Sequence, residues 1–265
     1  MINAAVLGSP IKHSLSPLLH SLAYEHLGLD GSYEAIEVGL GQLASFLERT
    51  EKNCLSLTMP LKEEALSLAS EISPISVSVS SGNTFTVKEG QWSLTSTDVA
   101  GFEHALKYNK VESFNSVVVL GAGATARAAV ACLSTFAKEI YVVSRNQARE
   151  EAMNRASLTD LNYLPWGLTD KINSADLIIN TTPLNTAEYF LPSISAPKGV
   201  LFEVLYDPWP TQLSRVWAES GAQVIDGLEL LIHQAISQVE IFSHGVVDRK
   251  ELHQLMRSAA VMKLG

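Results

Sequence analysis

Lys62 is the first residue whose type and place in the chain point to chemistry. It ends the segment 58–62 (T-M-P-L-K), in which Pro60 marks the start of a predicted helix. A cation in the first turn of a helix opposes the helix dipole, so a purely structural lysine would lie better at the other end. The position therefore favours a lysine that gives and takes a proton. The alternative is a solvated surface lysine, the usual state of a single Lys.

Asp98 and Asn83 are candidate partners for this lysine. Asp98 follows a predicted strand and precedes a predicted helix. It is therefore either an N-cap or a carboxylate that orients and electrostatically balances Lys62. Asn83 offers an amide donor and acceptor, or is a turn residue. Residue types alone leave both alternatives open for each position.

Ser14 and Ser16 place two hydroxyls one residue apart, just before the predicted helix 17–27. Such a pair can bind a small oxygen-rich anion, helped by the positive end of the helix dipole. For Ser16 the simpler role of an N-cap is equally compatible with the sequence, because Pro17 follows at the first helical position. Ser14 has no such structural explanation.

A glycine-rich turn in the second half of the chain predicts a dinucleotide site. Residues 121–126 (G-A-G-A-T-A) fit the pattern G-x-G-x-x-G/A, directly after the apolar strand 116–120 and at the start of a helix. The glycines permit a tight turn and a close backbone approach, and the helix N-terminus presents free N–H groups to a pyrophosphate. The alternative is a glycine turn that only allows close packing of helix on sheet.

The end of the next strand indicates which dinucleotide. An NAD enzyme usually has Asp or Glu about 20 residues beyond the glycines, to bind the ribose 2′-hydroxyl. Here residues 144–149 read S-R-N-Q-A-R, with no acid before Glu150. Arg145 and Arg149 could hold a 2′-phosphate through bidentate hydrogen bonds, which favours NADP over NAD. The alternative is that both arginines are solvated residues of a helix start.

These side chains require a framework of alternating strands and helices. In the first hundred residues we predict strands at 4–8, 32–38, 55–58, 77–80, 83–87 and 92–95, and helices at 17–27, 40–50 and from residue 60. After a helix at 99–108, we predict strands at 116–120, 139–144, 175–180, 200–205 and 223–225, and final helices at 228–242 and 249–262. The fold class is therefore α/β, with a doubly wound, Rossmann-type second part.

Composition excludes several classes of protein. The chain has 265 residues, of which 46% are hydrophobic and 18% charged, so a disordered protein is not expected. A net charge of −9 without a basic run argues against nucleic-acid partners. Cys54 and Cys132 lie in apolar surroundings, which suits a reducing cytoplasm. We find no signal peptide, membrane span, HExxH motif or Cys/His cluster, and so predict no membrane or metal site.

Taken in order, these motifs resemble the shikimate dehydrogenase family over nearly the whole chain. The segments that carry the resemblance are residues 8–17, 58–62, 83–84, 97–98, 121–126, 180–184, 206–208, 226–228 and 230–235. The resemblance implies NADP-linked interconversion of 3-dehydroshikimate and shikimate, a step in the biosynthesis of chorismate and the aromatic amino acids. It implies a substrate domain of residues 1–100, completed by helices 229–265, and an NADP-binding Rossmann domain of residues 101–228.

The resemblance also assigns roles to individual residues. Lys62 would be the general acid/base with Asp98 as its partner. The residues implied to line the substrate pocket are Ser14, Ser16, Thr58, Lys62, Asn83, Asp98, Tyr206 and Gln234. The residues implied to contact NADP are Gly121, Ala122, Gly123, Ala124, Thr125, Ser144, Arg145, Asn146, Arg149, Val204 and Gly227. A monomer or homodimer is expected.

Some positions depart from the family pattern. The family often has Asn where Ser56 stands, and usually Asp where Glu203 stands. Two alternatives remain: a quinate/shikimate dehydrogenase of the same architecture, against which Arg145 argues, and a non-catalytic NADP-binding sensor, which would have lost Lys62 or Asp98. In every case a chain of net charge −9 must attract anions locally, through Arg145, Arg149, Lys62 and helix N-termini.

Overall fold

The computed structural model describes residues 1–167 and 170–265, which form two compact units. Unit 1 consists of Met1–Gly101 and Leu231–Gly265, and unit 2 of Phe102–Leu230. The chain passes from one range to the other within two helices, α5 (Asp98–Tyr108) and α10 (Gly227–Ser243). The last segment of the chain therefore completes the first unit.

Unit 1 is built on a six-stranded sheet in the order β2-β1-β3-β5-β6-β4. The strands are β1 (Ile2–Gly8), β2 (Gly31–Glu37), β3 (Cys54–Leu57), β4 (Glu71–Ile72), β5 (Thr84–Lys88) and β6 (Gln91–Thr95). Strand β1 pairs in parallel with β2 and β3, whereas β5 runs antiparallel to both β3 and β6. The β5–β6 hairpin turns at Glu89 and Gly90, both with positive φ, as a two-residue hairpin turn requires.

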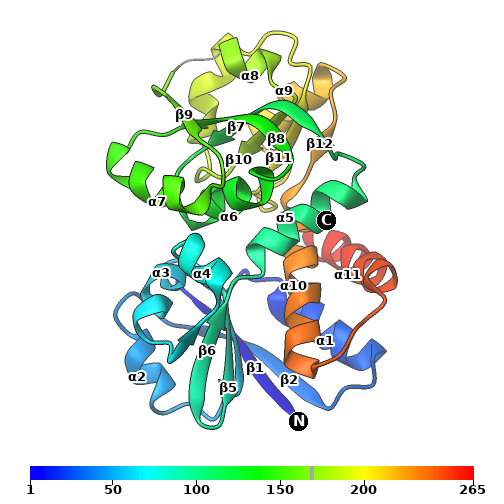
Figure 1. Ribbon diagram of the computed structural model, residues 1–265. Coiled ribbons are helices and arrows are strands. Elements are labelled where there is room, and N and C mark those ends of the chain that lie inside the picture. The colour runs from blue at the N-terminus through cyan, green and yellow to red at the C-terminus, as the bar shows by residue number, and fades with distance from the viewer. Residues whose placement is uncertain (168–169) are drawn as a thin grey trace. The chain divides into compact units, whose positions relative to one another are not determined.

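Helices cover both faces of this sheet (Figure 1). On one face lie α1 (Ser16–His26), α10 and α11 (Arg249–Leu264). On the other lie α2 (Leu43–Leu47), α3 (Leu61–Glu64) with the 3₁₀ turn η1 (Ala65–Ser67), and α4 (Pro74–Ser78). The apolar core under α2 and α3 joins Leu43 and Leu61 to Leu55 and Phe85 of the sheet. Because both faces are covered, alternate residues of β3 point to two different interiors.

Two predictions for unit 1 are wrong. Residues 77–80 were expected as a strand, but 74–78 form α4, because Ser73 accepts a hydrogen bond from the Ser76 N–H and Pro74 occupies the first turn. Ser16 is not the N-cap of α1: it is the first helical residue, and Leu15 precedes it. The Ser14 hydroxyl accepts the Ser16 N–H at 3.3 Å, so Ser14 has the local structural role that we expected of its neighbour.

Unit 2 contains a six-stranded, wholly parallel sheet in the order β12-β11-β10-β7-β8-β9. The strands are β7 (Phe114–Leu120), β8 (Ala137–Val143), β9 (Leu161–Leu164), β10 (Leu177–Asn180), β11 (Val200–Glu203) and β12 (Val224–Ile225). The first strand of the unit, β7, lies between β8 and β10, so the strand order reverses beside it. At such a switch point the loops after neighbouring strands diverge and leave room for a ligand.

The helices of unit 2 follow the strands in alternation: α6 (Ala124–Leu133), η2 (Gln147–Arg149) with α7 (Glu150–Ala156), α8 (Asp170–Ser174), η3 (Ala187–Ser193) and α9 (Gln212–Glu219). A buried cluster joins α8, η3 and α9 to the sheet, with Trp217 and Phe190 as its largest members. This arrangement confirms the expected fold class. Strand β9 was missed, because its four residues carry no clear alternation.

In the part of the chain that the structure describes, no helix is both long enough and apolar enough to cross a membrane.

Candidate active site and cofactor site

Lys62 and Asp98 form a shielded ion pair in unit 1. The Lys62 Nζ donates to Asp98 Oδ2 at 2.5 Å, and the two side chains are only 17% and 6% exposed. Helix α3 has only four residues, so the predicted effect of a helix dipole on Lys62 is small. Lys62 is instead held by the carboxylate at the first residue of α5. A paired lysine with limited access to water is well placed to exchange a proton with a bound ligand.

Asn83 holds the other oxygen of this carboxylate. Its Nδ2 donates to Asp98 Oδ1 at 2.9 Å and also lies 3.2 Å from Gln234 Oε1. Its Oδ1 accepts the backbone N–H of Thr97 at 2.8 Å. Because a backbone N–H can only donate, this contact fixes which end of the Asn83 amide is the donor. The structure thus brings four of the predicted site residues together: Lys62, Asp98, Asn83 and Gln234.

Two further predicted residues, Ser16 and Thr58, lie at the ends of neighbouring elements in unit 1. Ser16 is buried at the start of α1. Thr58 follows β3, and its N–H donates to Leu7 O at the end of β1. A Cβ on Gly8 would lie only 2.3 Å from Thr58 Cγ2, so glycine allows this close approach.

The glycine turn of unit 2 has the geometry that a phosphate site needs. Gly121 has φ +108°, and a Cβ there would lie 2.5 Å from Thr181 Oγ1, so only glycine fits. Gly123 is the extended N-cap of α6, and no side chain caps the helix. Residues 124 and 125 begin α6, whose first turn contains no acidic residue. The uncapped N–H groups and the dipole of this ten-residue helix favour an anion.

Arg149 lies beside this turn. Its Nη1 donates to Ala122 O at 3.3 Å and lies 3.6 Å from the position that a Cβ of Gly123 would take. Arg149 is exposed, so its remaining donors are accessible. A guanidinium next to an uncapped helix N-terminus is a site suited to a phosphate.

The other predicted residues after β8 have different surroundings. The Arg145 guanidinium lies over the Trp166 ring, 5.3 Å from its centroid, in a cation–π contact. Asn146 caps the turn η2 by accepting the Ala148 N–H at 3.0 Å. Ser144 is half-buried directly after the strand. Of these residues, as far as the structure describes the chain, Arg149 is the one with a side-chain hydrogen bond to the glycine turn.

Val204 and Gly227 meet at the end of β11. A Cβ on Gly227 would lie 2.1 Å from Val204 O, so the start of α10 packs against this backbone. The Val204 N–H donates to Asn180 O, at the end of the neighbouring strand β10. Tyr206 lies in the loop after β11 of unit 2, whereas the other predicted substrate residues belong to unit 1.

Glu203, the last residue of β11, is a fully buried carboxylate. It accepts from Asn180 Nδ2 at 3.0 and 2.9 Å, from Thr211 Oγ1 at 3.1 Å and from the Leu205 N–H at 3.2 Å. Burial raises the pKa of Glu203, because loss of water disfavours the charged form. Its hydrogen bonds join the ends of β10 and β11 to the N-cap of α9.

Gln238, Ser56 and Thr84 were missed as site residues. Gln238 Nε2 donates to Asn83 O at 3.1 Å and to Thr84 Oγ1 at 3.0 Å, and its Oε1 accepts from Ser56 Oγ at 2.8 Å. One signal was present in the sequence, since Gln238 lies one helical turn after Gln234 and so on the same face of α10. Ser56 stands where the family often has Asn, but the spacing of residues in the sequence does not show that the Gln238 side chain reaches Ser56.

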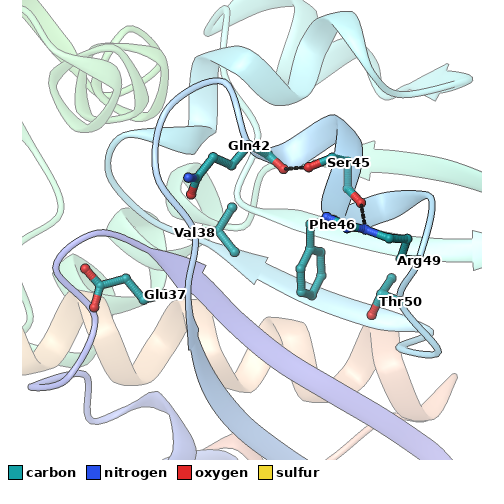
Figure 2. A pocket seen from close by; sticks show the side chains of 7 residues that line it. All are labelled: Glu37, Val38, Gln42, Ser45, Phe46, Arg49 and Thr50. Carbon is teal, nitrogen blue, oxygen red and sulfur yellow. Dashed lines mark hydrogen bonds between the residues drawn. The ribbon is translucent and has the colours of Figure 1, made fainter.

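Unit 1 also has a pocket of about 450 Å³ beside α2, which Figure 2 shows. The residues that line it are Glu37, Val38, Gln42, Ser45, Phe46, Arg49 and Thr50. Arg49 Nε donates to Ser45 O at 2.9 Å, so part of its hydrogen-bonding capacity is used within the helix region. None of the predicted site residues lines this pocket, and it adds no group to the Lys62 site.

Comparisons with known proteins agree with this geometry. The family model described as the shikimate dehydrogenase substrate binding domain matches residues 6–85. A curated protein of Prochlorococcus marinus named shikimate dehydrogenase (NADP(+)) is 34% identical, with 91% of this chain and 92% of that protein covered. A protein of the same name from Nostoc sp. is 33% identical, with 98% and 96% covered.

Solved structures give the same result. The shikimate dehydrogenase of Mycobacterium tuberculosis has a TM-score of 0.87 at 34% identity, with 97% of this chain and 99% of that chain covered. The shikimate 5-dehydrogenase of Thermus thermophilus, solved in complex with NADP(H) and shikimate, has a TM-score of 0.85 at 31% identity, with 98% and 100% covered. Since sequence and fold agree over almost the whole length, the chain belongs to the shikimate dehydrogenase family.

Proposed function

We propose that this chain is an NADP-dependent shikimate dehydrogenase that interconverts 3-dehydroshikimate and shikimate. The observation that carries the proposal is the Lys62–Asp98 pair, with Nζ and Oδ2 2.5 Å apart and little exposure to water. Asn83 and Gln234 stand beside this pair. Two relatives are named for this activity and align with this chain over nearly their whole length, which supports the assignment.

Lys62 is the proposed general acid/base. In the direction of reduction, a proton leaves the Lys62 ammonium for the oxygen of the C3 carbonyl, and the neutral amine takes it back in the direction of oxidation. Asp98 keeps the ammonium oriented and balances its charge. When bound, NADPH supplies the hydride that the carbonyl carbon accepts. Ser14, Ser16 and Thr58 are proposed to hold the substrate in register, with Tyr206 and Gln234 as further pocket residues.

The residues of unit 2 fit a dinucleotide. Gly121 permits the turn that only glycine adopts there, and the uncapped start of α6 offers N–H groups to a pyrophosphate. Arg149 stands beside that turn as the proposed partner of a 2′-phosphate, and Arg145 adds a second cation after the same strand. An acidic residue at this place would repel the phosphate, and residues 144–149 contain none.

We also propose that the enzyme acts in the cytoplasm as a monomer or a homodimer, without a nucleic-acid or membrane partner. The acidic composition and the absence of a basic run support this proposal. Sedimentation velocity at two protein concentrations gives the mass directly. A species larger than a dimer contradicts the proposed state.

One experiment tests the activity and its substrates together. Shikimate and quinate are each offered with NADP and with NAD, and absorbance at the reduced-nicotinamide band is followed. Turnover is expected with shikimate and NADP. Faster turnover with quinate or with NAD overturns the substrate or cofactor assignment, and no turnover in any combination supports a non-catalytic NADP-binding protein instead.

Replacement of Lys62 tests the mechanism. Loss of a proton-transfer group typically lowers the rate by about 10²–10⁴-fold, so Lys62→Ala is expected to lower kcat by that factor with a much smaller effect on shikimate binding. Lys52→Ala is the matched control, because Lys52 is similarly shielded and is ion-paired with Glu34 elsewhere in unit 1. If Lys62→Ala keeps kcat within about tenfold of the wild type, Lys62 is not the acid/base.

A further inference from the structure

A chain of buried polar side chains leads away from Asp98 into the interior of unit 1. Its members beyond Asn83 are Thr84, Gln238, Ser56 and Tyr33, with exposures of 1%, 1%, 4% and 8%. They come from β5, α10, β3 and β2, so segments distant in the sequence meet here. Polar groups buried to this degree are costly unless each one is hydrogen-bonded, and their arrangement is therefore well specified.

The direction of each hydrogen bond in the first half of this chain follows from its partners. Gln238 Nε2 lies 3.1 Å from Asn83 O, a carbonyl that can only accept, so the Gln238 amide nitrogen faces Asn83. Gln238 Oε1 is then an acceptor, and Ser56 Oγ must donate to it at 2.8 Å. With its single hydrogen used, Ser56 can only accept from the Tyr33 hydroxyl, 2.6 Å away.

The second half has the same direction. Thr84 Oγ1 accepts from Gln238 at 3.0 Å and donates to Asn83 Oδ1 at 2.8 Å. Asn83 Nδ2 then donates to Asp98 Oδ1 at 2.9 Å. All five hydrogen bonds from Tyr33 to Asp98 therefore point toward the carboxylate. We call this chain, formed by Tyr33, Ser56, Gln238, Thr84, Asn83 and Asp98, the hydrogen-bond relay.

An oriented relay of this kind has an electrostatic effect at its end. An amide that accepts a hydrogen bond at its oxygen donates more strongly from its nitrogen, and in a low-dielectric interior such polarisation accumulates along the chain. Gln238 and Asn83 are both amides used in this way. The last donor, Asn83 Nδ2, therefore binds the Asp98 carboxylate more firmly than an isolated amide would.

We propose that Gln238 and Thr84 are positioning residues for the Lys62–Asp98 pair, which act through the hydrogen-bond relay to fix the Asp98 carboxylate against Lys62. Neither residue is assigned a contact with substrate or cofactor. The Gln238 amide reaches Ser56, the position where the family often has Asn, so in this chain the buried amide beside β3 is supplied from helix α10. The proposal rests on the catalytic roles proposed above for Lys62 and Asp98.

The matched variants Thr84→Val and Thr84→Ser test the relay. Valine has the shape of threonine and suits a strand, but it cannot pass a hydrogen bond from Gln238 to Asn83, whereas serine can. We expect Thr84→Val to lower kcat by about two- to tenfold, the range of one net hydrogen bond, with the KM for shikimate within about twofold of the wild type. Thr84→Ser is expected to keep both constants.

A merely structural role predicts a different result. If Thr84 only stabilises the fold, Thr84→Val lowers the thermal midpoint and the fraction of folded enzyme. It then causes no selective loss of kcat per folded molecule. Wild-type kcat in Thr84→Val overturns the proposal, as does a loss that falls on KM alone or an equal loss in Thr84→Ser. Folded enzyme is counted by active-site titration with NADPH, so that the comparison is made per competent molecule.

Gln238→Met and Tyr33→Phe extend the test along the relay. Gln238→Met removes the central amide and is expected to lower kcat at least as much as Thr84→Val, whereas Tyr33→Phe removes only the outermost donor and is expected to have the smallest effect. A larger kcat loss in Tyr33→Phe than in Thr84→Val contradicts the relay. Lys62→Ala separates the two proposals: retained activity there overturns the catalytic role itself, whereas lost activity there with unaffected relay variants overturns only the relay.

Discussion

His20 should make the stability of the protein depend on pH in the mildly acidic range. It is fully buried in α1, stacks on Tyr33 with ring centroids 4.0 Å apart, and bonds Gln238 Oε1 through Nε2 at 3.2 Å. Because Oε1 only accepts, His20 must carry its proton on Nε2. Burial lowers the pKa of His20 from 6.5 to about 3, opposed in part by the hydrogen bond to Gln238.

The sign and size of the effect follow from linkage. Between the pKa of about 3 in the folded protein and 6.5 in the unfolded chain, only the unfolded chain binds the proton of His20. The stabilisation due to neutral His20 is therefore complete above pH 6.5 and is lost as the pH falls below it, by about 1.4 kcal/mol per pH unit. From His20 alone, the free energy of unfolding at pH 5 should be about 2 kcal/mol lower than at pH 7.

His20→Gln isolates the contribution, since glutamine can place an amide donor near the position of Nε2 and does not titrate. Urea unfolding of the wild type and the variant at pH 7, 6 and 5 gives the two pH dependences, and groups common to both cancel in the difference. The variant should be less stable at pH 7, through the lost ring stacking, but its unfolding free energy should fall less steeply. His13→Gln, at an exposed histidine, is the control. Equal slopes for wild type and His20→Gln refute the reasoning.

Three further substitutions have expected outcomes. Gly121→Ala forces a side chain into a backbone with φ +108° and toward Thr181 Oγ1, so it should lower stability by about 1–3 kcal/mol and weaken NADPH binding in a fluorescence titration. Arg149→Gln should raise the KM for NADP by about tenfold through one lost charge-assisted contact, and a rise in the KM for shikimate instead contradicts the assignment. Asp248→Ala removes the side-chain cap of α11 and should lower Tm by about 2–4 °C at unchanged kcat, as calorimetry and initial rates can check.

Much of the fold could be predicted, because its elements carry local signals. The apolar run of β7 and the glycines after it define a buried parallel strand and the turn into α6, and the structure has both. Residues 77–80 show where local signals mislead. Their β-branched residues favour a strand, but the cap at Ser73 and the proline after it begin a helix just before them.

The site could be predicted only in part, because sequence patterns name residues more readily than contacts. Lys62 and Asp98 were paired from their types, and the structure brings them together. The catalytic role of Lys62 was predicted from a helix dipole, but the observed helix α3 is too short to supply that dipole. Gln238 could not be paired with Ser56 from the sequence, because 182 residues separate them and only the return of α10 to unit 1 brings them together.

The Lys62–Asp98 ion pair affects how this protein of net charge −9 can attract its two proposed anionic ligands, the substrate carboxylate and NADP. Lys62 was expected to supply local positive charge, but Asp98 neutralises it at 2.5 Å, so the pair attracts a carboxylate weakly. The proposed substrate carboxylate must then depend on neutral donors such as hydroxyl groups. In unit 2, by contrast, Arg149 keeps its charge beside the uncapped start of α6. Since exposed charges are screened beyond about 8 Å at physiological salt, added salt should weaken NADP binding more than shikimate binding.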